Sequence, residues 1–161
     1  MHNGVMPKDL RLDDTDRRIV TLLAQDGRMS NAALAEACGI AQSTCLTRLR
    51  ALRDNGVIRG FHAEVDLAAL GYALQALVSV RLAGHGRDHI DQFRALATAL
   101  PGVLAVYHVT GQTDYLLHVA VPDADALRDF VLDHLVSRAS IAHAETSLIF
   151  EHIRGVGITT P

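Results

Sequence analysis

The residues with the clearest chemical potential lie in one stretch near residue 45, where short hydroxyl side chains and arginines recur at helical spacing. At 100° per residue, Ser43, Thr47 and Arg50 fall on one side of a helix, with Thr44 beside them. Such side chains can reach base edges in a DNA groove, and arginines at the margins can reach phosphates. An ordinary surface helix would also be polar outside. Because residues 28–62 hold five arginines and only two acids, the DNA interpretation is favoured.

The opposite side of this helix carries Cys45, Leu49 and Leu52, which should pack against the rest of a small domain. Upstream, Ser30 is a good N-cap for a preceding helix, and Gly39 can leave that helix in a left-handed conformation. Two short helices joined at a glycine form a helix-turn-helix, whose second helix enters the major groove. The predicted DNA-contacting residues are Gln42, Ser43, Thr44, Thr47, Arg48, Arg50 and Arg53.

A further helix is predicted over 12–25, before the helix-turn-helix, and a strand or hairpin (a wing) over 57–67, after it. Arg59 in that segment is either a phosphate contact or a solvated charge. The sequence predicts a DNA-binding domain over 11–60, a linking hairpin strand over 61–71 and a second domain over 72–154. A disordered lead-in (1–10) precedes them and a tail (155–161) follows them.

The second half alternates between branched, strand-forming runs and amphipathic helical runs. The expected strands are 73–82, 103–110, 115–121 and 144–153, and the expected helices are 87–100 and 123–137. The order β-α-β-β-α-β indicates a ferredoxin-like antiparallel sheet with both helices on one face. The fold class is therefore α+β.

The predicted strands are apolar on both faces. Leu148 and Phe150 alternate with Ile149 and Ile153 in the last strand, and 103–109 behaves in the same way. Two helices cover only one face of a sheet, so the second apolar face needs a partner, most simply a second copy in a two-fold homodimer. A dimer would also present two recognition helices to two half-sites.

Composition narrows the class of protein. The formal net charge is −3, and the surplus of acids lies after residue 66, as expected for a part that stays off DNA. Cys38 and Cys45 are the only cysteines and are expected to be free thiols. No signal peptide or transmembrane run is recognised, so a cytoplasmic protein that does not enter the membrane is expected.

Nine histidines are many for 161 residues. His85 and His89 have the spacing of one helical turn, but no Cys or carboxylate cluster completes a site, so no metal is expected. His108 and His118 lie in strands expected to pair, where they would face each other near the dimer interface and could make assembly depend on pH.

The arrangement resembles the Lrp/AsnC (feast–famine) family of transcriptional regulators over 12–154. Two segments carry the resemblance: LDDTDRRIVTLLAQDGRMSNAALAEACGIAQSTCLTRLRALRDNGVIRGFHAEVDLAALG and PGVLAVYHVTGQTDYLLHVAVPD. It implies an N-terminal winged helix-turn-helix, and a C-terminal ferredoxin-like (RAM-type) domain that binds an amino acid or related small molecule. It also implies homodimers that assemble into octamers or other multiples, double-stranded DNA as partner, and no cofactor.

The family's effector site lies where dimers meet, around a Gly-x-x-Asp connection. The predicted effector-binding residues are Gly111, Gln112, Thr113, Asp114, Ser147, Leu148 and Ile149. The Asp114 carboxylate suits an α-ammonium group, although Gly and Asp are also common in hairpin turns. Gln112-Thr113 differs from the acidic–aromatic pair of some leucine-type relatives, so the effector is not identified. Ala41 stands where relatives often have a capping Ser, a change of about 1 kcal/mol that could shift the helix start.

Two other classes of function remain open. Some sirohaem decarboxylases resemble this family in both halves and would use His and Arg around a bound macrocycle. A stand-alone amino-acid sensor would not depend on Arg48, Arg50 and Arg53 for any DNA affinity. The regulator is the favoured interpretation, with no catalytic residue expected, because the Ser43–Thr47–Arg50 face is intact.

Overall fold

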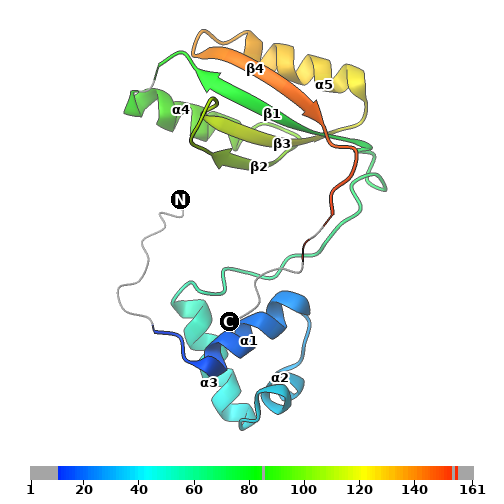
Figure 1. Cartoon of the computed structure of the whole chain (residues 1–161). Helices are drawn as coiled ribbons and strands as arrows, with labels where there is room; N and C mark the ends of the chain where they lie inside the picture. Colours follow the sequence, from blue (N-terminus) through cyan, green and yellow to red (C-terminus); the bar gives the residue numbers. More distant parts are fainter. Residues whose placement is uncertain (1–10, 85, 154, 156–161) are drawn as a thin grey trace. The chain divides into compact units, whose positions relative to one another are not determined.

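The computed structural model describes residues 11–84, 86–153 and 155, which divide into two compact units at residues 64 and 65 (Figure 1). Of the predicted lead-in 1–10 and tail 155–161, all but Gly155 lie outside the described residues. No helix of the described part combines the length and apolar character needed to cross a bilayer.

Three helices make up the first unit: α1 (Asp14–Gln25), α2 (Asn31–Cys38) and α3 (Gln42–Asp54). The Asp13 carboxylate caps α1 by accepting from the Asp16 N–H at 2.8 Å, and the Ser30 hydroxyl caps α2 by accepting from the Ala33 N–H at 3.2 Å. Gly39 ends α2 at φ 66°. The predicted N-cap at Ser30 and the predicted turn at Gly39 are confirmed. The buried core they support consists of Ile19, Leu23, Leu34, Ala35, Cys45 and Leu52.

The predicted strand over 57–67 is wrong, since these residues form no strand in the structure. The N–H groups of Val57 and Ile58 both donate to the Leu52 carbonyl, at 2.9 and 3.1 Å, and both side chains pack on the helical core. A strand needs a neighbour for its backbone groups, and the described part of this unit offers no other strand.

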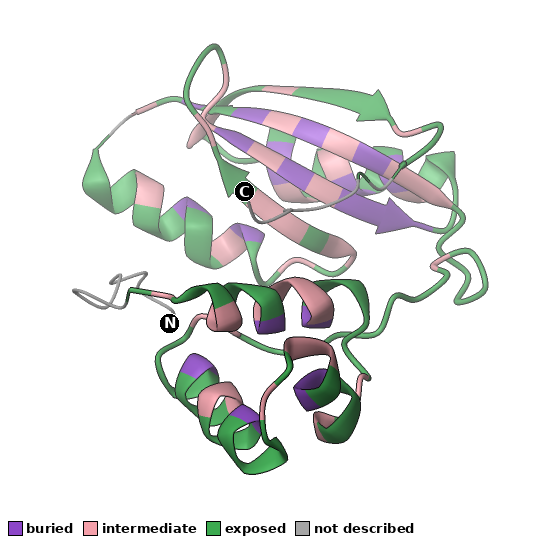
Figure 2. Ribbon diagram, turned by 60° about the horizontal axis from the view of Figure 1, so that its bottom comes forward, coloured by how far each residue is buried: buried purple, intermediate pink, exposed green. Residues whose placement is uncertain are grey.

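The second unit has the predicted β-α-β-β-α-β order. Its elements are β1 (Leu74–Leu82), α4 (Arg87–Ala97), β2 (Val103–His108), β3 (Tyr115–Val121), α5 (Ala124–Val131), the π-helical turn η1 (Leu132–Val136) and β4 (Ile141–Leu148). The strands pair antiparallel in the order β2-β3-β1-β4. Figure 2 shows the buried residues alternating along the central strands.

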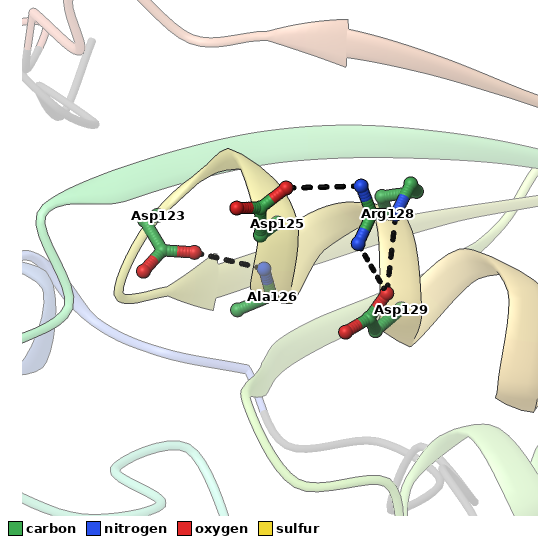
Figure 3. A network of polar contacts seen from close by, with 5 residues as sticks. All are labelled: Asp123, Asp125, Ala126, Arg128 and Asp129. Carbon is green, nitrogen blue, oxygen red and sulfur yellow. Dashed lines mark hydrogen bonds and ion pairs between the residues drawn. The ribbon is translucent and has the colours of Figure 1, made fainter.

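The core of the second unit lies between one face of the sheet and both helices. Val78 and Leu117 are fully buried partners on that face, and Phe93 from α4 and Phe130 from α5 pack in the same cluster. The Asp123 carboxylate caps α5 by accepting from the Ala126 N–H at 2.8 Å (Figure 3). Both helices therefore cover one face, as predicted.

The opposite face, here called the open face, differs from the prediction. Its register positions are Gln75, Leu77, Ser79, Arg81, Ala105, Tyr107, Leu116, His118, Ala120, His143, Glu145 and Ser147. The face is apolar on β2 and β3 but polar on β4. A bulge in β2 places Val103 and Val106 on the core side together, and β4 ends at Leu148, so Phe150 and Ile153 lie beyond the strand.

Candidate functional site

One side of α3 is exposed and polar over its whole length. We call Gln42, Ser43, Thr44, Thr47, Arg50 and Arg53 the recognition face, and all six residues are exposed. Cys45 and Leu52 on the other side are 0% and 3% exposed. The Thr47 hydroxyl donates to the Ser43 carbonyl at 3.0 Å, which leaves its oxygen to accept. The predicted helix faces are confirmed.

Arg48 does not belong to the recognition face. Its guanidinium donates to the carboxylates of Asp13 and Asp16, at 2.7 and 2.8 Å. These bonds raise the pKa of Arg48. The backbone N–H of Asp16, followed by Arg48, lowers the pKa of Asp13. These two ion pairs join α3 to the start of α1, and the expected DNA contact of Arg48 stays a prediction that must compete with them. The acids responsible lie 35 and 32 residues away in sequence, so helical spacing could not reveal them.

α3 begins at Gln42 without a side-chain cap. Ala41 is the N-cap residue and accepts no side-chain bond, so the backbone N–H groups of the first turn have no capping side chain. The helix begins at Gln42 although Ala41 supplies no side-chain cap. Free N–H groups at a helix start favour a negatively charged neighbour such as a phosphate.

A depression of about 540 Å³ lies at the other end of α3. Its rim carries three arginines, Arg50, Arg53 and Arg59, together with Asp54 and the exposed ring of Phe61; Ile58 and Gly60 complete it. Three cations around one hollow provide several donors for phosphate oxygens. From the sequence, Arg59 could be either a phosphate contact or a solvated charge, and Phe61 was not predicted to have a role. Their position next to Arg53 depends on the chain turning back on α3 instead of forming a strand.

The connection between β2 and β3 is held by its own aspartate. The Asp114 carboxylate accepts from the Leu82 N–H at 2.7 Å, and the Asp114 N–H donates to the Val80 carbonyl at 2.9 Å. Gly111 has φ 124°, a conformation that favours glycine. Asp114 thus fixes the loop to the end of β1, and its expected contact with an effector ammonium group stays a prediction.

Beside this loop, a depression of about 450 Å³ is lined by Arg81, Gln112, Thr113, His143 and Glu145. We call it the loop depression. Arg81 of β1 pairs with His143 of β4, and Ser79 pairs with Glu145, so Arg81 and Glu145 are diagonal neighbours on the open face. The sequence predicted Gln112 and Thr113 but missed the three strand residues. Arg81 stood out only as a charge in the largely apolar run 73–82, whereas His143 lies before the strand expected over 144–153 and Glu145 lies among other polar residues of that run.

The last strand contributes differently from the prediction. Leu148 pairs with the buried Ala76, so it belongs to the helix-covered side of the sheet and not to the side of the loop depression. Ser147 is on the open face but outside the depression's lining, and Ile149 follows the end of β4. Placing these side chains required the register of β4.

The histidines form no common site in the described part of the chain, where no group of three or more His, Cys, Asp or Glu residues is arranged to hold a metal. His108 stacks on Tyr115, with ring centroids 4.6 Å apart. His118 pairs with Ala105 and bonds the Gln75 side chain at 2.9 Å, so the two histidines do not face each other as predicted. Residue 85 lies outside the described residues. Cys38 and Cys45 are free thiols, as expected.

Comparison with known proteins is consistent with both units. A winged helix-turn-helix DNA-binding family model matches residues 12–59, and an Lrp/AsnC ligand binding domain model matches residues 75–155. The HTH-type transcriptional regulator AldR of Mycolicibacterium smegmatis is 49% identical over 152 residues, covering 92% of this chain and 89% of that protein. The leucine-responsive regulatory protein of Rhizobium meliloti is 33% identical over 145 residues, covering 90% and 93%.

A solved structure supports the same grouping. The complex of a transcriptional regulator from Neisseria meningitidis with L-Met matches this chain with a TM-score of 0.82 and 34% identity, covering 90% of this chain and 94% of the other. The fold and the exposed face of α3 define a DNA-binding transcriptional regulator. The chain belongs to the Lrp/AsnC family.

Proposed function

We propose that this regulator changes its DNA binding when an amino acid or a closely related small molecule occupies the loop depression. The observation that carries this proposal is the pair of opposite charges, Arg81 and Glu145, in one hollow with Gln112 and Thr113. A guanidinium suits an α-carboxylate, and a carboxylate suits an α-ammonium group. The Neisseria relative, which was solved with L-Met, supports an amino-acid effector.

At the DNA end, Gln42, Ser43, Thr44 and Thr47 are the base-reading side chains, and Arg50 and Arg53 bind phosphates, with Arg59 added from the structure. Short hydroxyl and amide side chains read base edges, and arginines at the margin supply sequence-independent affinity. We propose that the chain acts on double-stranded DNA in the cytoplasm, as a regulator and not as an enzyme.

The assembly we propose is a homodimer that pairs the apolar half of the open face, with dimers combining into octamers or other multiples. Leu77, Tyr107 and Leu116 form that half, and Tyr107 is 51% exposed in the isolated chain. A second copy would bury this surface and place two recognition helices on one duplex. The domains would then be DNA-binding (11–60), linking (61–71) and effector-binding (72–154).

Calorimetric titration of the twenty amino acids into the full-length protein tests the effector proposal, with DNA binding measured in parallel. Arg81→Gln should weaken binding of the effector by roughly tenfold or more, the loss expected for one charge-assisted hydrogen bond. Arg94→Gln, on an exposed face of α4, is the matched control and should leave binding unchanged. Sirohaem binding without salt-sensitive DNA binding would contradict the proposal in favour of a decarboxylase-like enzyme.

A further inference from the structure

Asn31 makes a long-range contact with the beginning of the recognition helix. It is the first residue of α2, and its side-chain Nδ2 donates to the Gln42 carbonyl at 3.0 Å, across eleven positions of sequence. Gln42 is the first residue of α3 and is followed by Ser43 and Thr44 of the recognition face. One amide therefore joins the start of α2 to the residues closest to the bases in the proposed interface.

The contact matters because α3 has no cap of its own. The start of α2 is fixed locally by the Ser30 hydroxyl, whereas Ala41 at the corresponding position of α3 makes no side-chain bond. Without a cap, the first turn of a helix frays readily and its direction is poorly defined. The Asn31 amide supplies from a neighbouring helix a restraint that the local sequence lacks.

The other end of the same amide has no partner. The Asn31 Oδ1 atom is buried and, among the residues that the structure describes, accepts no hydrogen bond. A buried acceptor without a donor costs stability, and an apolar side chain of similar size would avoid that cost. Stability alone therefore does not account for an asparagine here, whereas the bond from Nδ2 to Gln42 does.

We propose that Asn31 is a positioning residue for DNA recognition, which sets where the recognition helix begins and how its first turn is presented. This inference rests on the proposed base contacts of Gln42, Ser43 and Thr44. Misplacing a first turn weakens the contacts to specific bases, while contacts to phosphates tolerate it. Asn31 should thus affect selectivity between DNA sequences more than affinity for DNA in general.

The test uses full-length protein and two duplexes, one selected from a random pool by the unmodified protein and one with the same bases scrambled. Asn31→Leu should lower affinity for the selected duplex by roughly tenfold, the equivalent of one lost base contact. Affinity for the scrambled duplex and the melting temperature should not fall. The matched control is Asn55→Leu, because the Asn55 amide donates to Ala51 within α3 itself, at 2.8 Å. It should leave the ratio of the two affinities unchanged.

Asn31→Asp and a rescue variant make the result decisive. Aspartate keeps the shape and suits the start of α2, but it cannot donate to the Gln42 carbonyl, so its ratio should fall as well. Ala41→Ser, which supplies the missing cap, should restore the ratio in either background. An unchanged ratio of the two affinities in both Asn31 variants, or a ratio that falls only together with the melting temperature, would overturn the inference.

Arg50→Ala serves as a separate check on the proposed interface. Full DNA affinity in that variant would contradict the interface and not the role of Asn31.

Discussion

The two candidate sites are built in different ways. The recognition face belongs to one helix, so its six side chains keep their spacing whenever α3 forms. The loop depression takes residues from β1, β4 and the β2–β3 connection, and it exists only when the sheet is paired in the observed register. A site on one helix keeps its internal spacing when other parts of its domain change, whereas a site assembled from strands loses its arrangement when the pairing of those strands changes.

The largest expected effect comes from Leu117→Ala, which attacks the sheet at a fully buried position paired with both β1 and β2. We expect a loss of about 2–5 kcal/mol in the free energy of unfolding of the second unit. Hydrogen exchange should show lost protection in β1 and β3, with α3 unchanged. Equal loss of protection in α3 would contradict an effect confined to the sheet. Leu34→Ala is the matched variant in the first unit and should reverse the pattern.

The next effect concerns the cations of the recognition face. Replacing Arg50 and Arg53 together by Ala should weaken DNA binding by roughly a hundredfold. The slope of the logarithm of the binding constant against the logarithm of the salt concentration should become shallower by about two. Both side chains are exposed, so the melting temperature should stay the same. Gel shifts over a series of salt concentrations measure the slope. Arg87→Ala with Arg94→Ala, two exposed arginines of α4, form the control, and an equal loss from that pair would contradict the assignment.

Asp114 separates the structural and sequence-based interpretations of the loop. Asp114→Ala leaves the part-buried Leu82 N–H without its acceptor, which should cost about 1–3 kcal/mol of stability. Asp114→Asn keeps an oxygen for that N–H and should cost less while retaining effector binding. If Asp114 instead held the ammonium group directly, the Asn variant would lose effector binding with little change in stability. Calorimetric titration of both variants distinguishes the outcomes.

The smallest effect is expected from His118. Burial, followed by the charge of His152, lowers the pKa of His118 from its ordinary value of 6.5. The unfolded chain therefore takes up a proton before the folded chain does, so stability falls as the pH decreases from 6.5 to the lowered folded-state pKa. His118→Gln should flatten this part of the stability curve, measured by urea unfolding at a series of pH values. His62→Gln in the first unit is the control, and a steeper curve for His118→Gln would show that the sign is wrong.

The same contrast between the sites explains what could be predicted from the sequence. Ser30 and Gly39 act on their own neighbours, so the helix-turn-helix and the faces of α3 followed from local spacing. The order of strands and helices followed equally well from alternating patterns. These features need no knowledge of distant residues.

The features that could not be predicted depend on long-range partners. Arg48 lies at the right angle for DNA, but Asp13 and Asp16 of α1 neutralise it. Arg81 and Glu145 meet only through the pairing of β1 with β4. The expected strand over 57–67 had suitable residues but no neighbouring strand. In each case the outcome was decided by a contact that periodicity does not encode.

The central claim is that the outer face of α3 reads DNA, and site-specific photocrosslinking tests it most directly. A photoreactive residue placed at Ser43 of the full-length protein should crosslink to bases of the selected duplex. The same residue placed at Ala24, which is exposed on α1, should crosslink weakly or not at all. Strong crosslinking from position 24 with none from position 43 would contradict the account.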